Sequence, residues 1–149
     1  MDNKINWQNF IKLEFASVPE NVGLARITVA SFASQVDLTL NDLEELKVAT
    51  SEAVSNAIIH GYENDSKGQI IVEAIRQDGQ LILTIEDFGK GIEDIEKAMQ
   101  PAYSTDPERM GLGFVFMKSF MDDIQVKSTI GQGTKVTMKK KLKPIKALN

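Results

Sequence analysis

Two apolar segments joined by a two-residue turn constrain the fold of this sequence more than any other feature. Gln69–Arg76 and Gln80–Asp87 are both rich in apolar and β-branched residues, and Asp78-Gly79 lies between them. Asp-Gly is a preferred pair for tight hairpin turns, in which both central residues adopt positive φ. We therefore expect an antiparallel hairpin in the middle of the chain.

Further strands and helices are predicted on both sides of this hairpin. Strands are expected at residues 10–16, 124–129 and 134–142, with a glycine-containing turn at 131–133. A helix is expected from a capping box at Ser17-Val18-Pro19-Glu20 to about Val36, with Ile27 among its packing residues. Two more are expected from a cap at Asn41 or Asp42 to Gly61 and from Gly111 to about Met121, and residues 92–99 are expected to form a short helix or turn.

This order of elements predicts an α+β fold. Consecutive strands joined by short turns make a mixed, mostly antiparallel sheet, and the helices must then cover one face of it. The expected architecture is a two-layer α/β sandwich in a single domain spanning residues 1–149. It differs from the alternating pattern of a doubly wound nucleotide-binding fold, and the sequence has no G-x-x-x-x-G-K-[ST] phosphate loop.

Composition limits the kinds of site and ligand that this chain can have. Hydrophobic residues make up 42% and charged residues 26% of the 149 residues, as in an ordinary globular domain. Without cysteine and with one histidine, thiolate and histidine-rich metal centres are excluded, which leaves hard cations bound by oxygen. The net charge of −4 disfavours direct nucleic-acid binding. We see no signal peptide and no apolar run that could cross a membrane, and we expect a cytoplasmic protein.

A polar stripe runs along the second predicted long helix. Glu52, Asn56 and His60 recur every fourth residue and so lie on one side of that helix. They stand at the edge of the apolar arc, where a polar side chain can line a cleft between helix and sheet. A surface stripe is the alternative interpretation.

Two glycine-bearing segments follow the stripe. Asp87 ends a predicted strand and precedes Gly89 and Gly91, so its carboxylate could accept a hydrogen bond from an amino group of a base that approaches the backbone closely. A simple turn is the alternative for this segment. The second segment, Gly111-Leu112-Gly113, precedes a helix, where backbone N–H groups can bind an anion.

Several side chains could act on a bound nucleotide. The Asn56 amide oxygen could bind Mg²⁺, whose other ligands are commonly water and phosphate. Glu52, one turn away, could take a proton from an attacking hydroxyl. His60 is better explained as support for the helix end than as a base. Beyond the helix, residues that could reach phosphates are Ser104, Thr105 and Arg109.

Taken together, these segments resemble the GHKL ATPase superfamily, which includes ATPases of the gyrase, Hsp90, histidine kinase and MutL types. The matching positions are Glu52, Asn56 and His60 on the helix, Asp87, Gly89 and Gly91 in the first glycine segment, Gly111 and Gly113 in the second, and Gly131, Gly133 and Thr134 in the last. The resemblance covers nearly the whole chain in the right order.

Residues 15–32, 51–62 and 120–123 further resemble the anti-sigma F factors of sporulating bacteria, a family of serine kinases that act on an anti-anti-sigma factor. The resemblance implies a Bergerat ATP-binding fold with ATP and Mg²⁺ as ligands. Asp87 would contact adenine, supported through water by Thr134, while Asn56 would hold Mg²⁺ and Glu52 would be the general base.

The resemblance also implies how the chain meets its partners. Residues 101–113 would form a lid over ATP, with Arg109 placed for the γ-phosphate or for the partner. Arg26 would lie on the surface that binds either the sigma factor or the anti-anti-sigma factor. Family members work as homodimers.

Three alternatives remain open on the sequence alone. The chain could be a stress-response kinase that controls a different sigma factor, or a module that binds ATP and a partner without catalysis. It could also be the detached catalytic domain of a histidine kinase, which the absence of a separate phosphoacceptor helix disfavours.

Overall fold

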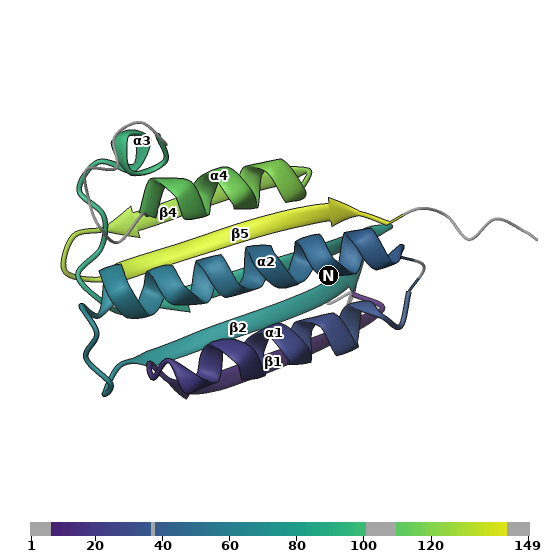
Figure 1. The fold of residues 1–149 in the computed structure, drawn as a ribbon, viewed down its shortest axis with the longest axis horizontal. Coiled ribbons are helices and arrows are strands. Elements are labelled where there is room, and N and C mark those ends of the chain that lie inside the picture. The colour runs from purple at the N-terminus through teal and green to yellow at the C-terminus, as the bar shows by residue number, and fades with distance from the viewer. Residues whose placement is uncertain (1–6, 37, 101–109, 143–149) are drawn as a thin grey trace, which may run out of the picture.

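The computed structural model describes residues 7–36, 38–100 and 110–142. Helices and strands form two layers, with α1, α2 and α4 packed on one face of a five-stranded sheet (Figure 1). The elements in chain order are β1 (Asn9–Ala16), α1 (Glu20–Ala33), α2 (Leu40–Asn56), the π-helical turn η1 (Ala57–Gly61), β2 (Gln69–Gln77), β3 (Gln80–Asp87), α3 (Ile95–Ala98), α4 (Met110–Phe120), β4 (Asp123–Thr129) and β5 (Gly133–Lys141).

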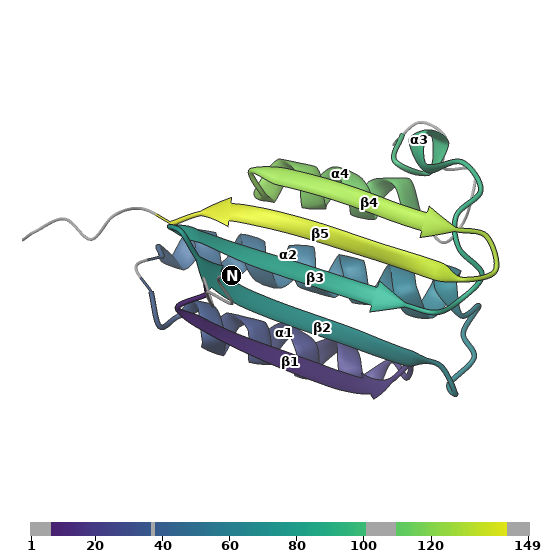
Figure 2. The same ribbon diagram turned by 180° about the vertical axis from the view of Figure 1, so that it is seen from behind.

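The strand order is β1-β2-β3-β5-β4, and all four pairings are antiparallel. The α+β two-layer sandwich predicted from the sequence is confirmed, while no parallel pairing of the mixed kind is seen among the described strands. The opposite face of the sheet is uncovered by the described helices (Figure 2).

The central hairpin forms as predicted. Gln77 pairs with Gln80, and the two turn residues Asp78 and Gly79 have φ of 52° and 73°. Both angles lie in the left-handed region that a tight hairpin turn needs. The turn chemistry therefore sets the β2–β3 register.

The core lies between the helices and the inner face of the sheet. Leu46 and Val54 of α2 have no exposed surface and face strand residues such as Leu83 and Ile85. Burial of one such side chain contributes about 1.5–3 kcal/mol. α2 lies centrally, between α1 and α4, so its polar edge is held rigidly beside the sheet (Figure 1).

Helix α1 differs from the prediction at both ends. The expected capping box is wrong: Pro19 is the N-cap residue and no side chain caps the helix. Ser17 is instead buried, donates to the Asp65 carbonyl and accepts from the Gly68 N–H. The helix ends at Ala33 rather than near Val36. Ile27, expected in the core, is 64% exposed.

Helix α2 begins earlier than predicted. Thr39 is its N-cap residue, not Asn41 or Asp42, and its hydroxyl accepts from the Asp42 N–H. Asp42 completes a capping box by accepting from the Thr39 N–H at 3.3 Å.

The far end of α2 reaches Gly61 as expected, but its last turn is a π-turn. Tyr62 N–H bonds to the Ala57 carbonyl, five residues back. Such wide turns frequently occur at functional sites. Within the described residues, no helix is long and apolar enough to span a membrane.

Candidate nucleotide site

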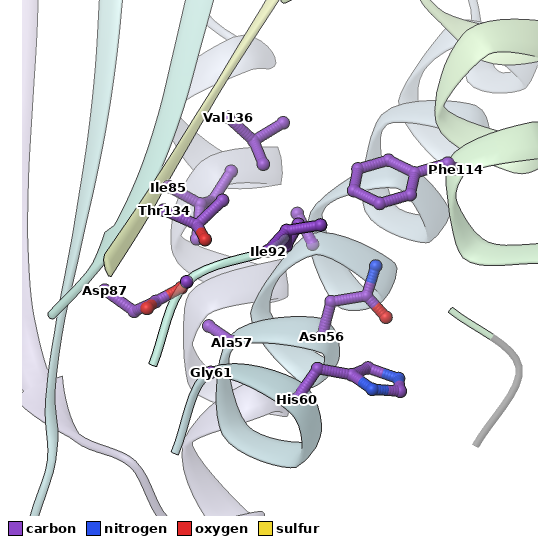
Figure 3. A pocket seen from close by; sticks show the side chains of 12 residues that line it. Asn56, Ala57, His60, Gly61, Ile85, Asp87, Ile92, Phe114, Thr134 and Val136 are labelled. Atoms are coloured by element: carbon purple, nitrogen blue, oxygen red, sulfur yellow. The ribbon is translucent and has the colours of Figure 1, made fainter. Parts of the chain in front are cut away.

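A pocket opens between α2, η1, the ends of β3 and β5, and the start of α4 (Figure 3). The space between these elements, open mouth included, is about 370 Å³. The lining residues are Ala53, Asn56, Ala57, His60, Gly61, Ile85, Asp87, Gly91, Ile92, Phe114, Thr134 and Val136. Two residues of the polar stripe, Asn56 and His60, thus meet Asp87 and Gly91 of the first glycine segment at one cavity.

Asp87 lies at the base of this pocket. It is the last residue of β3 and only 6% exposed. Burial raises the pKa of its carboxyl to about 6, against the opposing effect of hydrogen bonds from the backbone N–H groups of Gly89 and Thr134. The Gly89 bond measures 2.9 Å. A buried carboxylate in a pocket is a strong acceptor for a donor on a ligand.

Gly61 and Gly89 hold Asp87 in position through their lack of side chains. A Cβ at Gly61 would stand 2.8 Å from the Asp87 Cγ, and a Cβ at Gly89 would stand 2.0 Å from the Gly61 carbonyl oxygen. The same carbonyl accepts from the Lys90 N–H at 2.9 Å. The first glycine segment therefore also has a packing role, because its lack of side chains lets the loop after β3 contact the end of the α2–η1 helix closely.

Tyr62 is a supporting residue that the sequence analysis missed. Its hydroxyl donates to the Gln69 carbonyl and accepts from the Phe88 N–H at 2.7 Å. It therefore ties the end of η1 to the start of β2 and to the residue after Asp87. Desolvation raises the pKa of Tyr62, so the hydroxyl keeps the proton that it donates. The only sequence signal is its position directly after Gly61.

Asn56 and Glu52 face the start of α4. A Cβ at Gly113 would stand 3.0 Å from Glu52 Oε2 and 3.2 Å from Asn56 Nδ2. Gly113 therefore allows α4 to pack against both polar side chains. Asn56 lines the pocket, whereas Glu52 lies one turn away and is only partly buried.

The Asn56 side chain has an unsatisfied polar atom. Its Nδ2 is buried and has no hydrogen-bond partner in the described part of the chain. Since the oxygen and nitrogen of an amide are assigned from their partners, the two ends of this amide can exchange. Either way, this pocket-lining side chain has a polar atom without a partner, as expected for a group that binds a ligand or metal.

No group of three or more His, Cys, Asp or Glu side chains able to hold a metal occurs among the described residues. A cation here would rest on Asn56 and on oxygens of water and ligand, a pattern that suits Mg²⁺. The donor chemistry of the pocket therefore fits this ion.

His60 and Arg26 are both anchored in the structure. His60 is 6% exposed and lies in the last turn of η1, on the wall of the pocket. Arg26 donates to the Ser51 hydroxyl at 3.2 Å, which links α1 to α2 beside Glu52.

Of the remaining predicted residues, some lie in the described part of the chain, which resumes at residue 110, and some lie before it. Gly111 and Leu112 lie in the first turn of α4, which begins one residue earlier than expected. Ser104, Thr105 and Arg109 lie outside the described residues. Their expected roles therefore stay predictions.

A family model for the histidine kinase-like ATPase domain matches residues 15–140. The anti-sigma F factor of Clostridium acetobutylicum is 52% identical over 136 residues, which cover 90% of this chain and 94% of that protein. That of Geobacillus kaustophilus is 47% identical over 143 residues, or 95% and 98% of the two chains. The chain belongs to the anti-sigma F factor family.

Solved structures support the same fold for this anti-sigma F family member. The RsbU and RsbW domains of a Mycobacterium tuberculosis protein align with a TM-score of 0.67 at 20% identity, covering 95% of this chain and 35% of that one. The catalytic domain of histidine kinase ThkA aligns with a TM-score of 0.60 at 14% identity, covering 90% of this chain and 96% of that one. The GHKL-type ATPase fold and the family resemblance are thereby confirmed.

Proposed function

We propose that this anti-sigma F family member binds ATP in the pocket, inhibits a sigma factor of the sigma F type, and phosphorylates a serine of an anti-anti-sigma factor. The observation that carries the proposal is the meeting of Asp87, Asn56 and Thr134 at one cavity, with Gly113 packed against Asn56 and Glu52. Membership in a family of histidine kinase-like ATPase domains supports ATP as the ligand.

The base of ATP would lie at the inner end of the pocket. Asp87 would accept a hydrogen bond from the exocyclic amine of adenine, and Thr134 would support it through water. Both are buried, so a hydrogen bond made there is not exposed to competing solvent. Gly89 and Gly91 hold the surrounding loop, and His60 supports the wall at the helix end.

The phosphates would extend toward α4. Backbone N–H groups of Gly111, Leu112 and Gly113 lie in the first turn of that helix, where an anion is favoured. From the segment before it, Ser104, Thr105 and Arg109 would complete the phosphate contacts. Mg²⁺, held by Asn56, would neutralise charge that develops on the phosphate oxygens.

Glu52 would act as the general base. Its carboxylate would take the proton of the substrate serine hydroxyl, whose oxygen attacks the γ-phosphorus while the bond to the bridging oxygen breaks and ADP leaves. The unsatisfied Asn56 amide and the closely packed Gly113 border Glu52 on α2. This arrangement would orient the carboxylate toward the proposed phosphate site at the start of α4.

Partner binding would use Arg26 and Arg109. Arg26 lies on α1 and contacts Ser51, the neighbour of Glu52 in sequence, so a partner that reaches Arg26 would also be near the proposed base. We further propose that the protein works as a homodimer in the cytoplasm, where its sigma factor partner acts, and makes no direct contact with nucleic acid.

The decisive experiment combines the purified chain with labelled ATP, Mg²⁺ and the anti-anti-sigma protein encoded in the same genome, followed by mapping of the phosphorylated residue. Phosphoserine on that partner supports the kinase. ATP binding and sigma factor inhibition without phosphoserine would instead support a non-catalytic binding module. Recovery of a stress-response sigma factor in a pull-down would support the stress-response alternative.

A further inference from the structure

A row of three polar side chains crosses the sheet at the inner end of the pocket. Asp87 of β3 pairs with Thr134 of β5, and Thr134 pairs with Ser128 of β4. Directly paired residues point to the same face of a sheet, so all three side chains lie on the face that the helices cover. Asp87 and Thr134 line the pocket (Figure 3), and the Ser128 hydroxyl lies within hydrogen-bond distance of Thr134.

The Ser128 hydroxyl contacts three groups at once. It accepts from the Ile92 N–H at 2.7 Å, lies 3.1 Å from the Gly133 carbonyl oxygen, and lies 2.8 Å from Thr134 Oγ1. A hydroxyl has one proton to donate and two lone pairs that accept. The direction of the Ser128–Thr134 bond therefore depends on the other two contacts.

Those two contacts leave one arrangement that satisfies all three groups. The Gly133 carbonyl can only accept, so it takes the Ser128 proton. The Ile92 N–H can only donate, so it occupies one lone pair of Ser128. The second lone pair is then left for Thr134, which must donate its own proton to Ser128.

A Thr134 hydroxyl that donates to Ser128 offers only lone pairs to the pocket. Its neighbour across the strand pair, Asp87, is also an acceptor, so the inner end of the pocket presents two acceptors side by side. Adenine carries an amino donor at C6, whereas guanine carries a carbonyl acceptor there. The adenine amine can therefore donate directly to this pair, whereas the guanine carbonyl would face two acceptors.

We propose that Ser128 is a specificity-determining residue that holds Thr134 as an acceptor and so favours ATP over GTP. The inference rests on the proposed function, since it concerns the base end of the same pocket. Ser128 acts through Thr134 and does not itself touch the base. Its effect must therefore depend on the presence of the Thr134 hydroxyl.

A double-mutant cycle tests this dependence. Dissociation constants for ATP and GTP are measured by calorimetry on the full chain, on Ser128→Ala, on Thr134→Val and on the double variant. We expect Ser128→Ala to reduce the preference for ATP over GTP by about tenfold, because Thr134 is then free to donate to the guanine carbonyl. In the Thr134→Val background, Ser128→Ala should change the preference no further.

Ser128→Thr is the matched control, because it keeps the hydroxyl and should retain the wild-type preference. Loss of the Ile92 hydrogen bond alone would weaken ATP and GTP binding equally in Ser128→Ala, and an unchanged ratio would overturn the inference. An equal loss of preference with and without the Thr134 hydroxyl would also overturn it.

Ser128→Cys provides a second variant if Ser128→Ala does not fold. Its thiol is a weak donor and acceptor, so it should also lower the ATP preference, and a wild-type ratio would contradict the inference. A wild-type chain that binds neither nucleotide is a different result, because it overturns the proposed ATP site itself.

Discussion

Gly113 of α4 lies against the carboxylate of Glu52 on α2, where an added Cβ would stand 3.0 Å from Oε2. The contact joins the element that begins the proposed phosphate site to the proposed base. Because the Glu52 carboxylate is the end of a flexible side chain, it can move aside when this position gains a methyl group. A substitution at Gly113 should therefore reduce phosphoryl transfer without a matching loss of stability.

We expect Gly113→Ala to keep or slightly raise the melting temperature while phosphoryl transfer falls at least tenfold. Alanine is favoured over glycine within a helix by up to about 1 kcal/mol, but its methyl group displaces Glu52 and Asn56. Thermal unfolding and transfer rates measured on the same preparation check both parts. A large drop in melting temperature would contradict this account of the contact.

Glu52→Gln should leave ATP binding nearly unchanged and reduce transfer to the partner serine by at least 100-fold, because the amide cannot take the hydroxyl proton. Calorimetry gives the affinity, and single-turnover transfer gives the rate. Glu45→Gln, on the same helix, is a matched control that should transfer normally. Normal transfer by Glu52→Gln would refute the base assignment.

Asn56→Ala should weaken ATP binding in the presence of Mg²⁺ by about tenfold or more, with a much smaller effect when EDTA is present. The variant removes the unsatisfied amide that faces the pocket, so the fold should tolerate it. Titration with and without Mg²⁺ separates the two contributions. Equal weakening under both conditions would contradict the role of metal ligand.

Asp87→Asn tests the raised pKa of Asp87. In the folded chain the pKa of this carboxyl is about 6, above its ordinary 3.8. Ionisation of Asp87 therefore lowers the free energy of unfolding by its full amount above about pH 6, and the effect is absent below about pH 3.8. The cost at pH 7.5 is at most about 3 kcal/mol, and asparagine, which carries no charge, avoids it.

The stability of Asp87→Asn relative to wild type should therefore fall as the pH decreases from 7.5 to 4. Urea unfolding at several pH values measures the difference, and a pH-independent difference would contradict the raised pKa. The same variant should lose adenine selectivity. Asp94→Asn, at the exposed start of α3, serves as the control for general charge effects.

Tyr62→Phe should lower the free energy of unfolding by about 1–3 kcal/mol, because it leaves the Phe88 N–H and the Gln69 carbonyl without this partner. The ring and its packing against Gly68 stay the same. Chemical denaturation measures the change. An unchanged stability would mean that water replaces the hydroxyl at both sites.

Sequence patterns predict the strands well, because apolar strand residues and turn residues are local features of the chain. Asp78-Gly79 fixed the hairpin, and the strand from Gln80 to Asp87 was placed without error. Helix starts were less predictable. Ser17 looks like a cap, yet its hydroxyl bonds to Asp65 and Gly68, which lie about 50 residues away and carry no local signal.

The stripe of Glu52, Asn56 and His60 on one helix edge, and the glycine segments around Asp87 and Gly113, could be read from residue spacing alone. Spacing determines which side chains share a face of a helix or the end of a strand. Tertiary structure decided which groups those faces contact. It places Gly113 against Glu52, Gly89 against Gly61, and the Ser128 hydroxyl within hydrogen-bond distance of Thr134. These contacts join elements distant in sequence, so they depend on how the layers pack rather than on any local pattern.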